Sequence, residues 1–145
     1  MIRVRNIEES LDFYCNKLGL VETRRSENEK GRFTLIFLAA PGNLENAKIN
    51  QSPLIELTYN WPDEKGETEQ YQSGRNFGHL AFEVDNIYDF CQKLIDKNVI
   101  INRPPKDGYM AFIKSPDGVS IELLQKGDTL EICEPFKSMK NIGSW

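Results

Sequence analysis

Ile-Glu-Leu occurs at residues 55–57 and again at residues 121–123, and each copy closes a segment of similar design. The first segment opens with Arg-Val-Arg-Asn-Ile at residues 3–7, and the second opens with Glu-Val-Asp-Asn-Ile at residues 83–87. Between opening and close, both segments carry a helix-like stretch and an apolar run led by a glycine. An internal repeat of this kind predicts two copies of one structural unit, with a glutamate at the same position in each.

Hydrophobic periodicity divides each copy into a strand, a helix and further strands, which makes the expected fold class α+β. Asn6 and Asn86 are the expected N-caps of the two helices. Ser-Pro-Asp-Gly at 115–118 is a hairpin signal, because proline presets one dihedral angle and glycine permits a positive φ. Arg24 and Arg25 are expected at a solvated strand edge. The expected helices are 7–18 and a stretch beginning at 87, and the expected strands are 1–5, 33–39, 53–60, 79–84, 109–114 and 119–125.

The 145 residues suit one domain built from these two modules. Module 1 is expected at about 1–61 and module 2 at about 77–125. The polar stretch 62–76 is expected to link them. Residues 126–145 show no sustained period, and we expect a tail that wraps the surface or a neighbouring subunit.

Composition excludes several classes of protein. A net charge of −4 with scattered basic residues argues against a nucleic-acid or acidic-membrane partner. No apolar run approaches the roughly 20 residues of a membrane span, and the N-terminal residues lack a signal-peptide pattern. Cys15, Cys91 and Cys133 are an odd number without close spacing, so neither a disulfide framework nor a zinc knuckle is indicated. We therefore expect a cytoplasmic protein.

Strand alternation places the single histidine and two glutamates on the face of the sheet that does not carry the helices. His79 lies opposite in direction to Leu80, Glu56 to Ile55 and Leu57, and Glu122 to Ile121. Taken singly, a histidine at a strand start is usually structural, and a glutamate on a sheet face is usually solvated. A solvated face gives no reason for both halves to keep glutamate in the same position. The repeat therefore favours a divalent-cation site formed by all three side chains.

Several runs resemble those of the glyoxalase I (lactoylglutathione lyase) family within the vicinal-oxygen-chelate superfamily. These runs are Asp-Phe-Tyr at 12–14, Leu-Gly-Leu at 18–20, Ile-Glu-Leu-Thr-Tyr-Asn-Trp at 55–61, Phe-Gly-His-Leu-Ala at 77–81, and Pro-Asp-Gly at 116–118 through Ile-Glu-Leu at 121–123. The resemblance covers the chain up to about Gln125. It implies two βαβββ modules per chain around a concave mixed sheet, and a homodimer with metal sites at the subunit interface.

The resemblance also implies roles for individual residues. Glu56, His79 and Glu122 would be metal ligands, with Glu122 as the principal catalytic base and Glu56 as its partner. Arg3, Asn60 and Arg75 match positions that hold glutathione, and Arg103 or Lys106 matches a further cationic contact for a glutathione carboxylate.

The implied activity is that of a carbon–sulfur lyase. It isomerises the hemithioacetal of glutathione and methylglyoxal to S-lactoylglutathione, by proton transfer through a metal-bound enediolate. Ligand type does not separate zinc from nickel, but the short N-terminus resembles the bacterial type and favours Ni²⁺ over Zn²⁺. Two alternatives share the fold: a metal-free protein that binds or sequesters a ligand, and another metal-dependent enzyme of the superfamily.

The family pattern has a fourth ligand, His or Gln, four residues before the arginine that matches Arg3. The repeat places the counterpart of His79 two residues upstream of Met1. We therefore expect the native polypeptide to carry a few more residues; a chain beginning at Met1 would have three protein ligands and hold metal more weakly or not at all.

Overall fold

The computed structural model describes residues 1–143 except Ser52, Ser73 and Arg75. The chain divides into two compact units, Met1–Gln72 and Ser73–Trp145. The boundary falls inside the expected linker, so most of residues 62–76 belong to the first unit. No helix in the described ranges has the length and apolar character needed to span a membrane.

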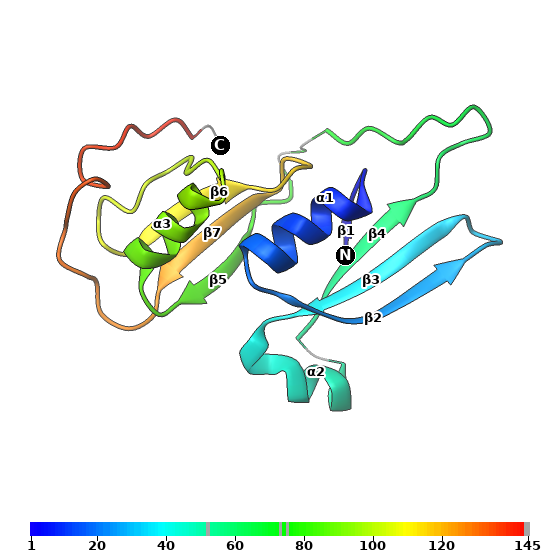
Figure 1. Cartoon of the computed structure of the whole chain (residues 1–145), viewed down its shortest axis with the longest axis horizontal. Helices are drawn as coiled ribbons and strands as arrows, with labels where there is room; N and C mark the ends of the chain where they lie inside the picture. The colour runs from blue at the N-terminus through cyan, green and yellow to red at the C-terminus, as the bar shows by residue number, and fades with distance from the viewer. Residues whose placement is uncertain (52, 73, 75, 144–145) are drawn as a thin grey trace. The chain divides into compact units, whose positions relative to one another are not determined.

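The first unit is a four-stranded sheet with the strand order β1-β4-β3-β2 (Figure 1). Strands β1 and β4 are parallel, and the other neighbours are antiparallel. A helix at 7–17 joins β1 to β2, and two short helices lie between β3 and β4. The elements are β1 (Ile2–Arg3), α1 (Ile7–Leu11), η1 (Asp12–Lys17), β2 (Val21–Asn28), β3 (Phe33–Ala39), η2 (Pro41–Asn43), α2 (Leu44–Asn50) and β4 (Ile55–Asn60).

The second unit repeats the plan with fewer residues in strands. Its three-stranded sheet has the order β5-β7-β6, with β5 parallel and β6 antiparallel to β7. An isolated antiparallel bridge from Arg103 to Phe112 stands where the first unit has β2. Each unit therefore follows a βαβββ order, with one strand of the second reduced to a bridge. The elements are β5 (Leu80–Val84), α3 (Ile87–Asp96), β6 (Met110–Lys114) and β7 (Ser120–Gln125).

Both predicted helix starts are confirmed. The Asn6 side chain accepts a hydrogen bond from the Glu9 N–H, and the Asn86 side chain accepts from the N–H groups of Tyr88 and Asp89. These bonds satisfy backbone donors that have no partner within the first turn. The first helix differs from expectation in its second half, where η1 is a π-helix. It ends before Gly19, whose φ of +84° suits the left-handed position after a helix.

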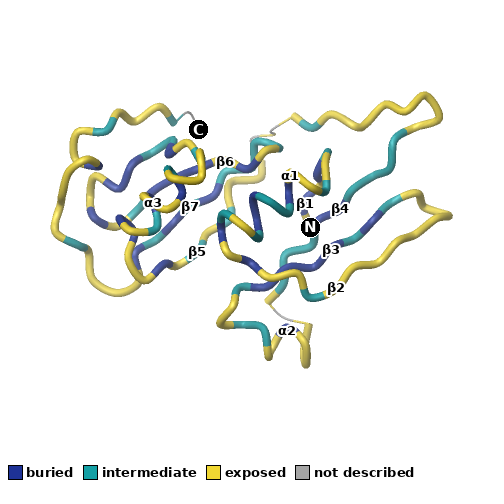
Figure 2. The backbone as a smooth tube through the Cα atoms, viewed as in Figure 1, coloured by how far each residue is buried: buried dark blue, intermediate teal, exposed yellow. Residues whose placement is uncertain are grey.

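The sequence indicates strand β2 without giving its range, and it does not predict helix α2. The expected strand edge at Arg24 and Arg25 lies in β2, and most residues of β2 are exposed, as Figure 2 shows along this strand. A strand with solvent on both faces has no apolar alternation to reveal it. Helix α2 has seven residues, of which only Ala47 is buried, so it carries no apolar stripe either.

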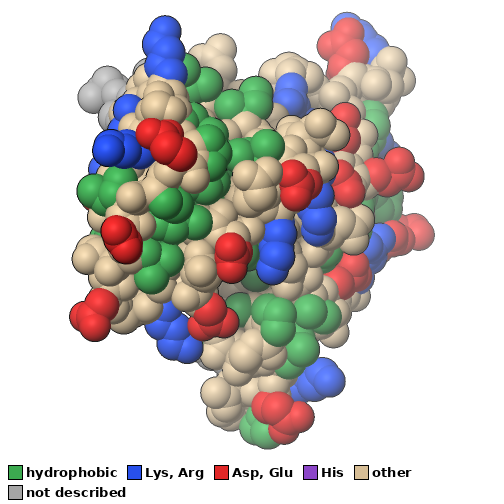
Figure 3. Space-filling model, turned by 60° about the vertical axis from the view of Figure 1, so that its left-hand side comes forward, with side chains coloured by type: hydrophobic (Ala, Val, Ile, Leu, Met, Phe, Trp, Pro, Cys, Tyr) green, Lys and Arg blue, Asp and Glu red, His purple; other side chains and the backbone are tan. Residues whose placement is uncertain are grey.

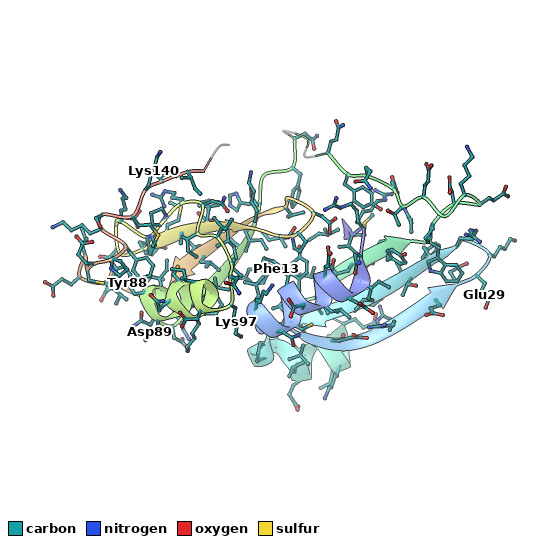
Figure 4. All side chains as sticks on the ribbon, turned by 45° about the horizontal axis from the view of Figure 1, so that its top comes forward. Phe13, Glu29, Tyr88, Asp89, Lys97 and Lys140 are labelled. Carbon is teal, nitrogen blue, oxygen red and sulfur yellow. The ribbon has the colours of Figure 1, made fainter. Side chains whose placement is uncertain are left out.

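The second unit has a core of its own between α3 and β7, and the tail covers one end of it. Phe136 is buried and stacks on Tyr88 of α3 with ring centroids 5.3 Å apart. Figure 4 shows Tyr88 and Asp89 at the start of α3. The tail also pairs with the body of the unit through the Ile142 N–H, which donates to the Asn102 carbonyl. The tail was expected to wrap either the chain's own surface or a neighbouring subunit, and in the structure it packs on its own chain.

Candidate active site

His79 and Glu122 form a pair on one face of the second sheet. Strands β5 and β7 run parallel, with Ala81 opposite Glu122 and His79 just ahead of β5. The distance from His79 Nε2 to Glu122 Oε2 is 3.1 Å. The His79 side chain is 41% exposed and the Glu122 side chain 15% exposed, so the carboxylate is largely shielded while the imidazole remains open to solvent. The parallel pairing of β5 with β7 thus brings together two of the predicted ligands.

Phe112 forms an apolar wall beside this pair. It lies directly opposite Glu122 in the β6–β7 ladder, so the two side chains share a face. Its ring meets the His79 ring edge to face, with centroids 5.4 Å apart. Shielding by an aromatic ring lowers the local dielectric constant, which strengthens the attraction between a carboxylate and a cation.

The pair has the chemistry and spacing of two ligands to one divalent ion. Imidazole nitrogen and carboxylate oxygen are both ligands of Zn²⁺ and Ni²⁺. With ligand bonds of about 2.0–2.2 Å, two ligands at right angles around one ion lie roughly 3 Å apart. The observed 3.1 Å between His79 Nε2 and Glu122 Oε2 fits that separation.

Glu56 has the same surroundings in the first unit. It lies opposite Phe37 in the β3–β4 ladder, as Glu122 lies opposite Phe112. Phe37 and Phe112 are both buried, and Glu56 is half-buried. The hydroxyl of Thr58 donates a 3.3 Å hydrogen bond to Glu56 Oε1. The repeat therefore extends from the two carboxylates to their aromatic neighbours.

Glu56, the third predicted ligand, belongs to a different unit from the His79–Glu122 pair. Across the described part of the chain, no three His, Cys, Asp or Glu side chains lie close enough together to hold a metal ion. Glu56 belongs to the first unit, and His79 and Glu122 belong to the second. A three-ligand set stays a prediction.

Two of the predicted glutathione residues lie near one another in the first unit. Arg3 is exposed and pairs with Thr58 in the β1–β4 ladder, two residues before Asn60. The Asn60 Nδ2 donates a 2.7 Å hydrogen bond to Glu69 Oε2. That bond lowers the pKa of Glu69 and outweighs the opposing effect of desolvation, and a bond from Tyr71 and the charge of Arg3 lower the pKa further.

The remaining cationic candidates differ in what surrounds them. The Arg103 guanidinium donates to the Met110 carbonyl at 2.9 Å and to Asp107 Oδ2 at 3.0 Å, so it braces the loop before β6. Lys106 is exposed in the same loop. Arg75 lies outside the described residues.

Asp107 is the anchor of that loop. Burial raises the pKa of its carboxyl, but bonds from the N–H groups of Met110 and Tyr109 and from Arg103 outweigh burial and leave the pKa lowered. Arg103 thus has an observed structural role, and its contact with substrate stays a prediction.

A family model for the Glyoxalase/Bleomycin resistance protein/Dioxygenase superfamily matches residues 1–123. The chain belongs to this glyoxalase superfamily. A probable lactoylglutathione lyase of Synechocystis sp. is 41% identical over 130 residues, covering 86% of this chain and 91% of that protein. A lactoylglutathione lyase of Neisseria meningitidis serogroup A is 40% identical over 131 residues, covering 87% of each chain.

The fold agrees with solved members of the glyoxalase superfamily. A trypanothione-dependent glyoxalase I of Leishmania major superposes with a TM-score of 0.72 at 30% identity, covering 86% of this chain and 82% of that one. The predicted vicinal-oxygen-chelate fold is therefore confirmed.

Sequence reasoning missed four residues in or next to the surroundings of the predicted site residues. The two phenylalanines opposite the glutamates could have been found by extending the repeat one strand further. The Arg24 guanidinium lies 3.7 Å from the Phe37 ring centroid, a stacking that a strand-edge assignment does not suggest. Glu69 had no signal, because it lies in the loop after β4 and reaches Asn60 only in the folded chain.

Proposed function

We propose that this protein is a lactoylglutathione lyase, which isomerises the glutathione–methylglyoxal hemithioacetal to S-lactoylglutathione. The observation that carries the proposal is the His79–Glu122 pair, 3.1 Å apart beside Phe112, with Glu56 repeated beside Phe37. Its support is a sequence identity of 40–41% to proteins of that name over most of both chains.

The reaction moves one proton between adjacent carbons and leaves the atom count unchanged. Glu122 takes the proton from C1 of the hemithioacetal and returns it to C2. The C1 hydroxyl loses its proton and becomes the thioester carbonyl, and the C2 carbonyl oxygen gains one proton and becomes the hydroxyl of the lactoyl group, so the protons on oxygen also balance. Positioned proton transfer of this kind contributes about 10²–10⁴-fold to rate. Glu122 suits the role because its side chain is largely shielded from water yet faces the open imidazole.

His79, Glu122 and Glu56 would hold a divalent cation in this proposal. When bound, such an ion supplies Lewis-acid stabilisation to the two vicinal oxygens of the enediolate. Ni²⁺ is proposed over Zn²⁺, supported by the similarity of the sequence to bacterial members of the family. The metal preference is measured by removing bound metal with chelator and comparing the affinities of the apoprotein for the two ions. Tighter binding and faster turnover with Zn²⁺ would contradict the nickel assignment.

The functional form in this proposal is a homodimer with its active sites at the subunit interface. Its support is the division of the proposed ligands between two units, each with a sheet of its own. The proposed location is the cytoplasm, supported by three free cysteines, of which Cys133 is exposed. Arg3, Asn60, Arg75 and a cation at 103 or 106 are the proposed glutathione contacts. Sedimentation or light scattering of the pure protein tests the dimer.

The activity is tested by adding the hemithioacetal to purified protein with Ni²⁺ or Zn²⁺ and following thioester absorbance. Absorbance should rise with the wild type, and Glu122→Gln should remove at least 99% of the rate. Glu83→Gln is the matched control, because Glu83 is an exposed carboxylate of β5 that lies on the same sheet face as His79. Tight binding of a hydrophobic ligand without turnover on any divalent metal would instead support the sequestration alternative.

A further inference from the structure

A cation, an amide and a carboxylate meet at the end of β4 in the first unit. Glu69 Oε2 accepts hydrogen bonds from Asn60 Nδ2 at 2.7 Å and from the Tyr71 hydroxyl at 3.1 Å. Arg3 lies on the adjacent strand, close enough for its charge to act on Glu69. Four side chains from β1, β4 and the following loop thus surround one exposed corner.

The loop is held at this corner by more than Glu69. Arg5 Nη1 donates a 3.3 Å hydrogen bond to Gln70 Oε1, which ties the residue after Glu69 to the start of the chain. Asp63 organises the preceding turn by accepting from the N–H groups of Lys65 and Glu67. The carboxylate of Glu69 is therefore placed by contacts on both sides of it.

The charges of this corner complement a zwitterion better than an anion. An arginine alone would suit any carboxylate ligand. A carboxylate beside it repels a simple anion but attracts a ligand that carries an ammonium group next to its own carboxylate. The γ-glutamyl end of glutathione is such a group, with an α-ammonium and an α-carboxylate on one carbon.

The position of the corner along β4 also fits glutathione. Asn60 is four residues after Glu56 on the same face of the strand, which is about 13 Å at the rise of a β-strand. Eight bonds separate the reacting carbon of the hemithioacetal from the γ-glutamyl α-carbon, which is about 9–10 Å when extended. The extended substrate is about 3–4 Å shorter than this backbone span. The side chains of Glu69 and Arg3 are long enough to cover that difference, so a substrate reacting beside Glu56 can place its amino-acid end at this corner.

We propose that Glu69 receives the α-ammonium group of the γ-glutamyl residue while Arg3 binds the α-carboxylate. Asn60 and Tyr71 hold the Glu69 carboxylate in place for that contact. Glu69 is then a specificity-determining residue that selects thiols with a free γ-glutamyl amine. The inference rests on the proposed function for the identity of the thiol.

The test measures binding of S-methylglutathione and of its N-acetyl derivative by calorimetry, without turnover. The wild type should bind the free amine about three- to tenfold more tightly, as expected for a partly solvated ion pair. Glu69→Gln should bring that ratio close to one by weakening the free-amine ligand alone. Glu69 is exposed, so the variant should fold normally. Glu67→Gln is the control, since Glu67 is also an exposed carboxylate in the same loop and contributes backbone groups to the Asp63 turn.

Four results would overturn the inference. An unchanged ratio in Glu69→Gln would mean that Glu69 does not contact the ammonium group. Tighter binding of S-methylglutathione by Glu69→Gln would mean that Glu69 competes with the ligand carboxylate for Asn60. Binding of neither ligand by the wild type would remove both this inference and the proposed function. Turnover of the hemithioacetal with no preference for the free amine would remove the inference alone.

Discussion

Glu56 and Glu122 each lie opposite a buried phenylalanine, and this shared environment explains why a carboxylate occurs mid-strand in both halves. A half-buried carboxylate loses hydration on the side covered by the ring, which costs free energy unless a cation or donor replaces the water. His79 supplies one such partner for Glu122, and Thr58 supplies one for Glu56. The unequal partners suggest unequal tasks for the two glutamates.

That difference leads to a prediction for the two carboxylates. Glu56→Gln and Glu122→Gln should both weaken metal binding, because each removes a charged oxygen ligand. Glu122→Gln should also lower the single-turnover rate by about 10²–10⁴-fold at saturating metal, since it removes the base. Metal titration and rapid-quench kinetics separate the two effects. A slower chemical step in Glu56→Gln than in Glu122→Gln would mean that Glu56, and not Glu122, is the principal base.

Asp107 gives a prediction for pH dependence. Its pKa is lowered in the folded protein, so its stabilising contribution is present above the ordinary value near 3.8 and lost as pH falls below it. Asp107→Asn should therefore make urea stability less dependent on pH below about 4, compared with the wild type. Asp117→Asn is a comparison variant in the β6–β7 turn. An equal pH dependence in Asp107→Asn would show that the loop contacts do not favour the ionised carboxylate.

At the scale of elements, the strands that form the site were predictable and the polar additions to the fold were not. Strands β3, β4, β6 and β7 match their predicted ranges within two residues, because each is rich in apolar residues that the fold buries wholly or in part. The site-bearing face follows from the alternation of side chains along a strand, and the ligand roles follow from resemblance. Strand β2 and the contact from Glu69 to Asn60 depend on solvent-exposed polar residues, whose positions are set by tertiary contacts and not by local pattern.

Gly108, in the loop before β6, packs so closely against the tail that a larger residue does not fit there. Gly108 has a φ of +71°, and a Cβ there would collide with the backbone of Leu130. Gly108→Ala should lower the free energy of unfolding by roughly 2–4 kcal/mol, from combined backbone strain and steric conflict. Gly42→Ala should be nearly neutral, because open space surrounds that position. Figure 1 shows the tail returning past this unit, and equal chemical stability of the two variants would contradict its close packing there.

The different burial of Cys91 in α3 and Cys133 in the tail predicts an order of thiol reactivity. Burial raises the pKa of Cys91 from 9.0 to about 12, whereas Cys133 is exposed in the tail. Iodoacetamide at pH 8 should label Cys133 first and Cys91 only after denaturation, because the thiolate is the reacting species. The raised pKa of Cys91 leaves stability intact below about pH 9 and diminishes it as pH rises toward 12. Mass spectrometry of native samples checks the order, and early labelling of Cys91 would contradict it.

At the scale of the whole molecule, the chain carries two related sheets, each with one glutamate in the repeated position and only one with a histidine beside it. On the face shown in Figure 3, acidic and basic side chains are interspersed, as scattered basic residues and a net charge of −4 predict. The sequence reveals the duplication, but it does not reveal which chain completes each site. An interface site would draw Glu56 from one subunit and the His79–Glu122 pair from its partner.

The central claim, that the two duplicated sheets form one catalytic centre across a dimer, is tested by mixing two inactive variants. Glu56→Gln and Glu122→Gln homodimers should each have little activity, since every site lacks one carboxylate. In a mixed dimer one site loses both carboxylates and the other keeps both, so random assortment should restore about one quarter of wild-type activity. Activity is measured by thioester formation after joint refolding with metal. No recovery in a sample that contains mixed dimers would contradict a centre shared between subunits.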